Sequence, residues 1–255
     1  MTKTKNQIWK RLSVHKAIAI TGIVAVAGCA SLDSAFAPSQ EQLSAGALSA
    51  WSGLKSEQQV STDPKYTSRM NRVAPKIIRA AGGNPSEWEV LVFESEQLNA
   101  FALPTGKIGF YTGILDLMEN DDQIAAVMGH EVAHVELEHS MQRAGRSNQL
   151  AALGGAVSVA AGQTANPSMW MSVFGVGANV GNALPFSRSH ESEADKVGLR
   201  YMAAAGYDPV EAVRFWESMS AQSKGAPPEL LSSHPSGPTR ISALKAEIEK
   251  MRAGS

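Results

Sequence analysis

The sequence predicts a mainly helical α+β fold in which a small antiparallel sheet precedes a long amphipathic helix. Three short apolar runs separated by turn residues predict the strands, at Trp88–Phe93, Asn99–Leu103 and Lys107–Tyr111. Apolar residues three and four positions apart predict the helix, which begins after Asn120 and extends to about Arg143. The chain has 255 residues, of which 44% are hydrophobic and 18% charged, so it is long enough for one or two globular domains.

Residues 1–28 are typical of a secretory signal. Five basic residues and no acid precede an apolar run of about 12 residues, which is too short to span a membrane. The run ends in Val26-Ala27-Gly28-Cys29, which resembles a bacterial lipobox, and Cys29 is the single cysteine of the chain. We therefore expect Cys29 to carry lipid and to begin the mature chain. Signal cleavage after Ala35-Phe36-Ala37 and an uncleaved anchor helix are the alternatives.

The residues after Cys29 indicate a location and a tether. No aspartate follows Cys29 directly, and by resemblance to sorted Gram-negative lipoproteins this favours the outer membrane, with the protein facing the periplasm. Removal of residues 1–28 lowers Lys+Arg from 23 to 18 against 24 Asp+Glu, so nucleic acid is not an expected partner. Residues 29–62 are expected to form the tether, with a short helix near Gln40–Leu54, and residues 63–255 the folded domain.

The folded domain is expected to open with a helix and continue into the sheet. Asp63-Pro64 is a typical helix start and Gly82-Gly83 a typical stop. The strand at Asn99–Leu103 lies shortly before the central helix. An edge strand in that position can pair with an extended peptide through main-chain hydrogen bonds. Asn99, Ala100, Phe101 and Ala102 are therefore candidate substrate-binding residues, and a purely structural hairpin is the alternative.

The central helix carries the residues that indicate chemistry. His130 and His134 are four residues apart, so both imidazoles lie on one face of a helix, and Glu131 follows the first histidine. This H-E-x-x-H pattern supplies two zinc ligands and a general base for a water activated by the metal. Asn120 is a typical N-cap for the helix. Because the pattern also occurs by chance, it requires a third ligand elsewhere in the chain.

A catalytic zinc ion usually has three protein ligands and an open position. The candidates for the third are His139, His190, Glu191, Glu193, Asp195 and His234. On a continuous helix His139 would lie about 140° away from His134, which excludes it as a ligand. Glu191 begins a second helix 57 residues after His134. Asp195 follows one turn later on the same face, where it can accept a hydrogen bond from a ligand histidine.

The segment between the two motifs is apolar and rich in small residues. Leu150–Gly162 and Ser168–Leu184 are each too short or too interrupted by glycine for a membrane span. We expect two helices that pack on the core. A membrane-touching hairpin is the alternative, in which Trp170, Met171 and Phe174 would be the contact residues.

Together these motifs resemble family 48 zinc metallopeptidases, which include the HtpX and CAAX prenyl proteases. Glu191-Ser192-Glu193-Ala194-Asp195 is similar to the E-x-x-A-D signature of that family. The resemblance extends to Asn99-Ala100-Phe101-Ala102, to Ser187-Arg188 before Glu191, and to His234-Pro235 with Arg240 six residues later. Thr105 departs from the glycine common in the family. The lipobox points to the periplasmic, LoiP- and BepA-like lipoprotein branch.

The resemblance implies a gluzincin-type zinc metallopeptidase domain with one zinc ion per chain, bound by His130, His134 and Glu191. Glu131 would be the general base, and Asp195 would orient a ligand histidine. His234 would lie near the metal, either assisting catalysis or blocking the open position. The implied function is a metalloendopeptidase that cleaves unfolded or misassembled cell-envelope proteins. A periplasmic chaperone or assembly factor with a closed, weakly active zinc site is the alternative.

Overall fold

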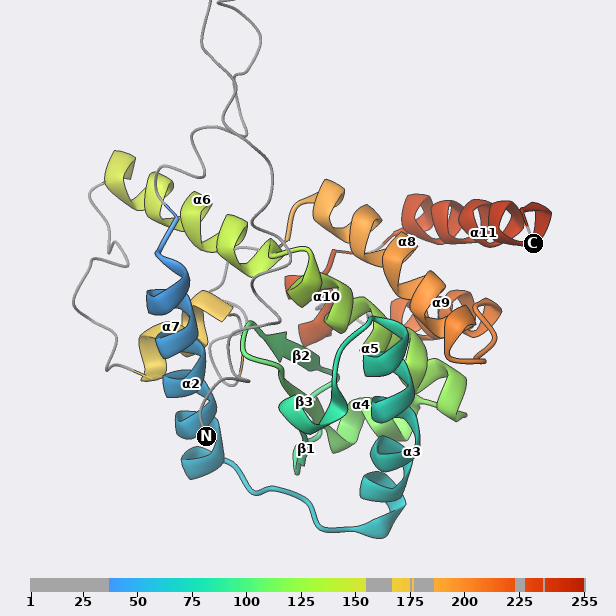
Figure 1. Cartoon of the computed structure of the whole chain (residues 1–255), viewed down its shortest axis with the longest axis horizontal. Coiled ribbons are helices and arrows are strands. Elements are labelled where there is room, and N and C mark those ends of the chain that lie inside the picture. The colour runs from blue at the N-terminus through green and yellow to red at the C-terminus, as the bar shows by residue number, and fades with distance from the viewer. Residues whose placement is uncertain are drawn as a thin grey trace, which may run out of the picture.

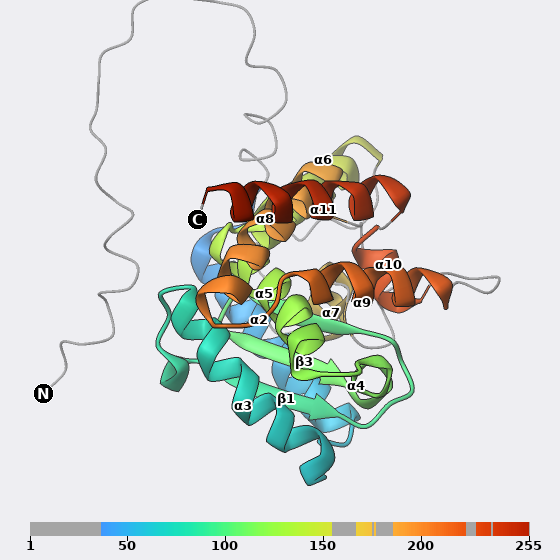
Figure 2. The same cartoon turned by 90° about the vertical axis from the view of Figure 1, so that its right-hand side faces the viewer.

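The computed structural model describes residues 37–154, 167–174, 176, 186–222, 228–235 and 237–254 (Figures 1 and 2). Its elements in chain order are α2 (Gln40–Glu57), α3 (Pro64–Ala80), the 3₁₀ turn η2 (Pro85–Glu87), β1 (Glu89–Phe93), β2 (Ala100–Leu103), β3 (Lys107–Tyr111), α4 (Thr112–Leu117), α5 (Asp121–Glu136), α6 (His139–Gly154), α7 (Pro167–Phe174), α8 (Arg188–Ala204), α9 (Val210–Ala221), α10 (Glu229–Ser233) and α11 (Pro238–Ala253). The expected mainly helical α+β class is confirmed. The signal segment 1–28 and Cys29 lie outside the described residues.

The three strands form one sheet in the order β1-β3-β2. β2 and β3 are an antiparallel hairpin in which Ala102 faces Ile108. β1 pairs with β3 in parallel, with Val90 opposite Ile108, so the expectation of a wholly antiparallel sheet is wrong. The connection between β1 and β2 carries the chain past the position of β3. Apolar periodicity identifies a strand but does not specify its neighbour, which is why the sequence did not reveal this crossover.

The sheet has a hydrophobic core on each face. Alternate strand residues point to opposite faces. Ile108 and Phe110 belong to the larger core, which contains α3, α5, α8, α9 and α11. Phe93, Phe101 and Tyr111 belong to the smaller core with α2 and α7, which lie together on the left of Figure 1. The sheet therefore separates the helices that carry the H-E-x-x-H and E-x-x-A-D motifs from the N-terminal helix.

The helix expected within the tether is present as α2. Ser39 caps it reciprocally with Gln42, and its apolar face is buried. The Trp51 ring packs edge-on against Phe93, with 5.6 Å between ring centroids. α2 is therefore a packed layer of the fold, joined to the sheet by large aromatic side chains.

Helix α7 packs against α2, and the structure contradicts the membrane-contact alternative for its residues. Trp170, Met171 and Phe174 are buried in the smaller core, with 1%, 1% and 4% of their surface exposed. The Trp170 ring lies against Gly46, where an added Cβ would come within 2.2 Å of it. Among the helices that the structure describes, none combines the length and apolar character that a membrane crossing requires. Residues 155–162, 175 and 177–184 of the two expected helices lie outside the described part.

Helix α5 begins as expected but ends earlier. The Asn120 side chain accepts a hydrogen bond from the Gln123 N–H. The helix stops at Glu136, seven residues before the expected end near Arg143. Glu138 has φ of 55°, a left-handed conformation that closes many helices, and a new helix starts at His139. A glutamate rarely adopts that conformation. Because position 138 is not a glycine or an asparagine, the sequence did not indicate the break.

Helices α5 and α8 cross at two glycines. An added Cβ on Gly198 would lie 2.9 Å from the backbone nitrogen of His130 and 3.0 Å from the carbonyl carbon of Gly129. The neighbouring atoms belong to backbone, which cannot rotate away as a side chain can. The absence of side chains at this crossing allows the two motif helices to approach closely, and it brings His130 to the start of α8.

We expect Gly198→Ala to separate these helices and to lower the free energy of unfolding by about 1–3 kcal/mol, as overpacking usually does. Urea unfolding of the purified protein measures the change. Gly237→Ala is the matched control, because an added Cβ there has no atom within 4 Å, and we expect it to change the unfolding free energy by less than about 0.5 kcal/mol. Equal losses in both variants would contradict the close-approach explanation.

Candidate metal centre and catalytic residues

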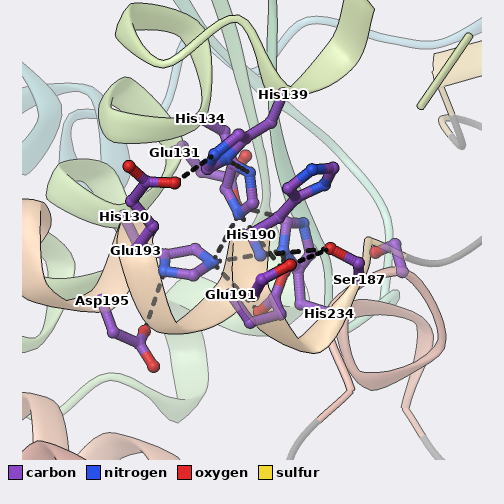
Figure 3. A network of polar contacts seen from close by, with 12 residues as sticks. His130, Glu131, His134, His139, Ser187, His190, Glu191, Glu193, Asp195 and His234 are labelled. Atoms are coloured by element: carbon purple, nitrogen blue, oxygen red, sulfur yellow. Dashed lines mark hydrogen bonds and ion pairs between the residues drawn. The ribbon is translucent and has the colours of Figure 1, made fainter. Parts of the chain in front are cut away.

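Four buried side chains from three segments converge on one point. His130 and His134 of α5, Glu191 of α8 and His234 after α10 each offer an atom that lies within 4.8 Å of the others (Figure 3). The Nε2 atoms of His130 and His134 are 3.0 Å apart. The Glu191 carboxylate lies 3.3–3.4 Å from both. Two imidazoles and one carboxylate are a ligand set of catalytic zinc, and the donors present here fit that ion.

The electrostatics of the cluster favour a cation between the donors. Burial opposes charge on His130, but the Glu191 and Asp195 carboxylates raise its pKa to about 9. Burial and the neighbouring His130 hold the pKa of His134 well below its ordinary value. Burial also opposes ionisation of Glu191, yet His234 and His130 keep its pKa well below the usual range. A proton on His130 thus balances the ionised Glu191 carboxylate, and a metal ion bound by His130 would displace that proton.

Asp195 has the expected contact with a histidine of the cluster. Its Oδ1 lies 2.9 Å from Nδ1 of His130. The Arg240 guanidinium donates to both oxygens of Asp195, at 2.7 and 2.8 Å, and lies 2.9 Å from Glu191. Arg240 also stacks on Trp216, with 3.7 Å from its central carbon to the ring centroid. Arg188, which the family resemblance includes just before Glu191, is exposed.

Glu131 lies between the donor cluster and strand β2. Its Oε2 accepts a hydrogen bond of 3.0 Å from the Ala102 N–H, and its Oε1 lies 3.4 Å from Nε2 of His234. Glu131 is buried, with 2% of its surface exposed. A carboxylate in this position can exchange protons with a group bound at the donor cluster and with a chain bound along β2.

Strand β2 is an edge of the sheet, and its outer main-chain groups face α5. Because the Ala102 N–H points away from β3, the N–H and C=O groups of Ala100 point the same way. The Phe101 side chain is buried against Phe93 and Tyr111, so this strand can contact a substrate mainly through its main chain. The Asn99 side chain is buried, and neither polar atom of its amide has a hydrogen-bond partner among the described residues.

The loop that carries His234 is held over the cluster from two sides. The Leu230 N–H donates to the carbonyl of Leu98, just before β2, at 3.1 Å. The Phe186 N–H donates to the carbonyl of Ser233 at 3.0 Å. The Phe186 ring stacks on His134, with 4.0 Å between ring centroids. These contacts join the sheet, α10 and the segment before α8 into a cover over the donors.

Two residues near His134 make contacts that the sequence did not indicate. His139 was excluded as a ligand because a continuous helix would place it about 140° away, and the helix break removes that reason. His139 is not one of the four converging donors, but its Nδ1 lies 2.9 Å from Nδ1 of His134. Glu193, another candidate for the third ligand, is 59% exposed, and its Oε2 lies 3.4 Å from Nε2 of His139. Neither contact was evident from the sequence, because no glycine or asparagine indicates the left-handed turn at Glu138.

Comparison with known proteins agrees with this geometry. A profile of Peptidase family M48 matches residues 64–248, which include all four donors and Arg240. The chain belongs to peptidase family M48. M48 enzymes are zinc metallopeptidases, and the buried group of His130, His134, Glu191 and His234 fits such an ion.

Named M48 relatives come from mitochondria and from bacteria. The chain is 33% identical to "Mitochondrial metalloendopeptidase OMA1" of Schizosaccharomyces pombe, over 71% of this chain and 54% of the relative. It is 25% identical to the "Beta-barrel assembly-enhancing protease" of Escherichia coli, over 74% of this chain and 40% of the relative. The Arabidopsis thaliana OMA1 is 36% identical over 62% and 31%. The chain thus spans about half or less of the length of these M48 relatives.

Proposed function

We propose that the protein is a zinc-dependent metalloendopeptidase that cleaves unfolded or misassembled polypeptides of the cell envelope. One observation carries the proposal: Glu131 lies between a buried His-His-Glu donor set and the outer edge of β2. A metal site, a proton acceptor and a template for an extended chain therefore meet within one short stretch of α5. Membership of family M48 supports the reaction class.

The residues of the site have separable roles in peptide hydrolysis. Zinc held by His130, His134 and Glu191 would supply Lewis acidity, which lowers the pKa of water and polarises the scissile carbonyl. Glu131 accepts the proton of the attacking water and passes it to the nitrogen of the leaving amine. His234, whose Nε2 is 3.4 Å from Glu131, can donate a hydrogen bond as negative charge develops on the carbonyl oxygen.

The β2 edge supports an unfolded substrate. The outer edge of β1 is already covered, because Val60 pairs with Phe93. The outer edge of β2 pairs with no strand in the described part of the chain, and its Ala102 N–H reaches the catalytic carboxylate. An extended peptide can add to this edge by main-chain hydrogen bonds, whereas a folded protein has already paired its own backbone.

We place the enzyme at the outer membrane, facing the periplasm, with a lipid on Cys29. The lipobox-like residues 26–29 support this anchor, and one relative is named for β-barrel assembly. Relatives named as mitochondrial share the same domain, so location depends on the N-terminal segment. Cys29→Ala should move the protein from membrane to soluble fractions on immunoblots, and retention in the membrane would favour an uncleaved anchor.

A chaperone with a closed zinc site is the second candidate function. It is favoured by the burial of His234, which has 2% of its surface exposed and offers a fourth donor to the cluster. A fourth protein ligand would occupy the position that water needs. In that case His234→Ala should raise cleavage, whereas loss of cleavage would assign His234 to catalysis.

Removal of the metal tests the proposed reaction. We expect purified mature protein to contain one zinc per chain and to cleave unfolded casein. Dialysis against a chelator should abolish cleavage, and stoichiometric zinc should restore it, because water is not sufficiently acidic without the ion. Metal analysis and the appearance of new peptide ends by mass spectrometry are the measurements. Full cleavage by protein shown to be metal-free would refute the mechanism.

A further inference from the structure

The imidazoles of His130 and His134 both face the donor cluster with Nε2, but their Nδ1 atoms have different partners. On His130 the outer Nδ1 meets Asp195, as in the known pattern of a carboxylate behind a metal-binding histidine. On His134 the outer Nδ1 meets no carboxylate among the residues that the structure describes. It lies 2.9 Å from Nδ1 of His139, which has 1% of its surface exposed.

We propose that His139 is a positioning residue for the metal site, which holds His134 through its Nδ1 and is itself oriented by Glu193. This inference rests on the proposed function in one respect, because it requires His134 to bind zinc. It assigns a role to His139 of α6 and Glu193 of α8, neither of which takes part in the proposed reaction.

The protons on the three side chains form one consistent arrangement. Nε2 of His134 lies 3.3 Å from Glu191 within the donor cluster, so a bound metal requires that nitrogen to be deprotonated. The proton of the neutral imidazole is then on Nδ1, which donates to Nδ1 of His139. His139 must accept at Nδ1 and therefore carries its own proton on Nε2. That N–H faces the Glu193 carboxylate at 3.4 Å.

The surrounding structure holds His139 in this position. The left-handed turn at Glu138, with φ of 55°, returns the chain so that His139 faces His134 from the first residue of α6. A glutamate in that conformation is strained, and such strain persists where the surrounding structure requires it. His190 stacks on His139 with 4.4 Å between ring centroids, and Phe186 stacks on the ring of His134. The stacking contacts thus fix the orientation of both ring planes, and the contact between the Nδ1 atoms fixes where the nitrogens point.

A matched pair of variants tests the contact. Asparagine places its side-chain oxygen near the position of Nδ1, so His139→Asn keeps the acceptor for His134. Glutamine places its oxygen near the position of Nε2, so His139→Gln loses it. We expect His139→Gln to weaken zinc binding about 10- to 100-fold and His139→Asn by less than about threefold. The dissociation constant is measured by competition with a chromophoric chelator, which does not require catalysis.

Two further readouts separate positioning from a general structural role. Cobalt substituted for zinc should show a changed visible absorption spectrum in His139→Gln, because the spectrum reports the geometry of the ligands. Glu193→Ala should weaken zinc binding about threefold, a modest factor because this carboxylate is largely exposed. The double variant of His139→Gln and Glu193→Ala should bind zinc no more weakly than His139→Gln alone, since both changes break one chain of contacts.

Glu217→Ala is the control, since it removes a similarly exposed carboxylate, on α9, that pairs with Lys245, and zinc affinity should change less than about twofold. The inference is overturned if the asparagine and glutamine variants bind zinc as tightly as the unaltered protein, with the same cobalt spectrum. Unaltered protein that binds zinc tightly but cleaves nothing would instead count against the proposed endopeptidase and leave this inference standing. Loss of zinc binding that follows only from unfolding is recognised by circular dichroism of the metal-free variants, and equal unfolding in both would also overturn it.

Discussion

Glu131→Gln is expected to lower the turnover number for peptide cleavage by about 10²–10⁴-fold, the usual contribution of a general base, while zinc content is unchanged. Glutamine has the shape of glutamate and keeps an oxygen that can accept the 3.0 Å hydrogen bond from Ala102. It cannot accept the proton of the attacking water. The loss should therefore appear in the turnover number, with the Michaelis constant nearly unaltered.

Quenched fluorescent peptides report the cleavage, and metal analysis of the same sample reports the zinc. Glu136→Gln is the matched control, because it makes the same change at the last residue of α5, about one and a half turns further along the helix. We expect its cleavage rate to stay within about twofold of the unaltered protein. If Glu131→Gln retained full activity in zinc-loaded protein, the assignment of the general base would be wrong.

Arg240→Met is expected to cause the largest loss of stability, about 3–5 kcal/mol in the metal-free protein. Arg240 contacts Asp195 and Glu191, and all three side chains are at least nine-tenths buried. Removing one partner of a buried ion pair leaves the other charge uncompensated, which is the reason for the size of the effect. Methionine retains an apolar stem against Trp216, so the loss is mainly electrostatic.

The pH dependence of this loss has a definite direction. Burial alone would raise the pKa of Asp195, but Arg240 and His130 bring it below its ordinary value. Its stabilisation is therefore present above the unfolded pKa and disappears as the pH falls through the folded pKa. Without Arg240 the folded pKa of Asp195 rises, so acid destabilisation should begin at a higher pH in the variant.

Urea unfolding at pH 7 and pH 5, in the presence of a chelator, measures both effects. Arg252→Met is the control, since Arg252 pairs with Glu249 and the two side chains are 59% and 71% exposed. Exposed pairs contribute about 0–1 kcal/mol, so this variant should change little. Equal losses in the two variants would show that Arg240 has no special electrostatic role.

The sequence indicated the donors through local geometry together with the family resemblance, which singled out Glu191 among the candidates for the third ligand. His130 and His134 share one helix face, and Glu191 with Asp195 repeats the one-turn spacing on a second helix. Both pairs depend only on helical periodicity. The helix starts at Asn120 and Asp63 were predicted for the same reason, since a cap acts within one turn.

Features that depend on distant contacts were not predictable. The parallel pairing of β1 with β3 depends on a crossover that apolar patterning does not encode. The early end of α5 depends on a left-handed glutamate, which is tolerated because the following residue packs against His134. Arg240 was identified only as part of a motif, because its carboxylate partners, Asp195 and Glu191, are 45 or more residues away.

The close approach of α5 and α8 at their glycines links metal binding to the stability of the protein in the cell. The helices that meet at Gly129 and Gly198 are the same two that carry His130, His134 and Glu191. A zinc ion would therefore act as a cross-link within the fold, and at a free concentration 100 times the dissociation constant it would add about 2.7 kcal/mol to the stability. Zinc supply would then set the abundance of the protein as well as its activity, because chains that lack the ion would themselves become substrates for degradation.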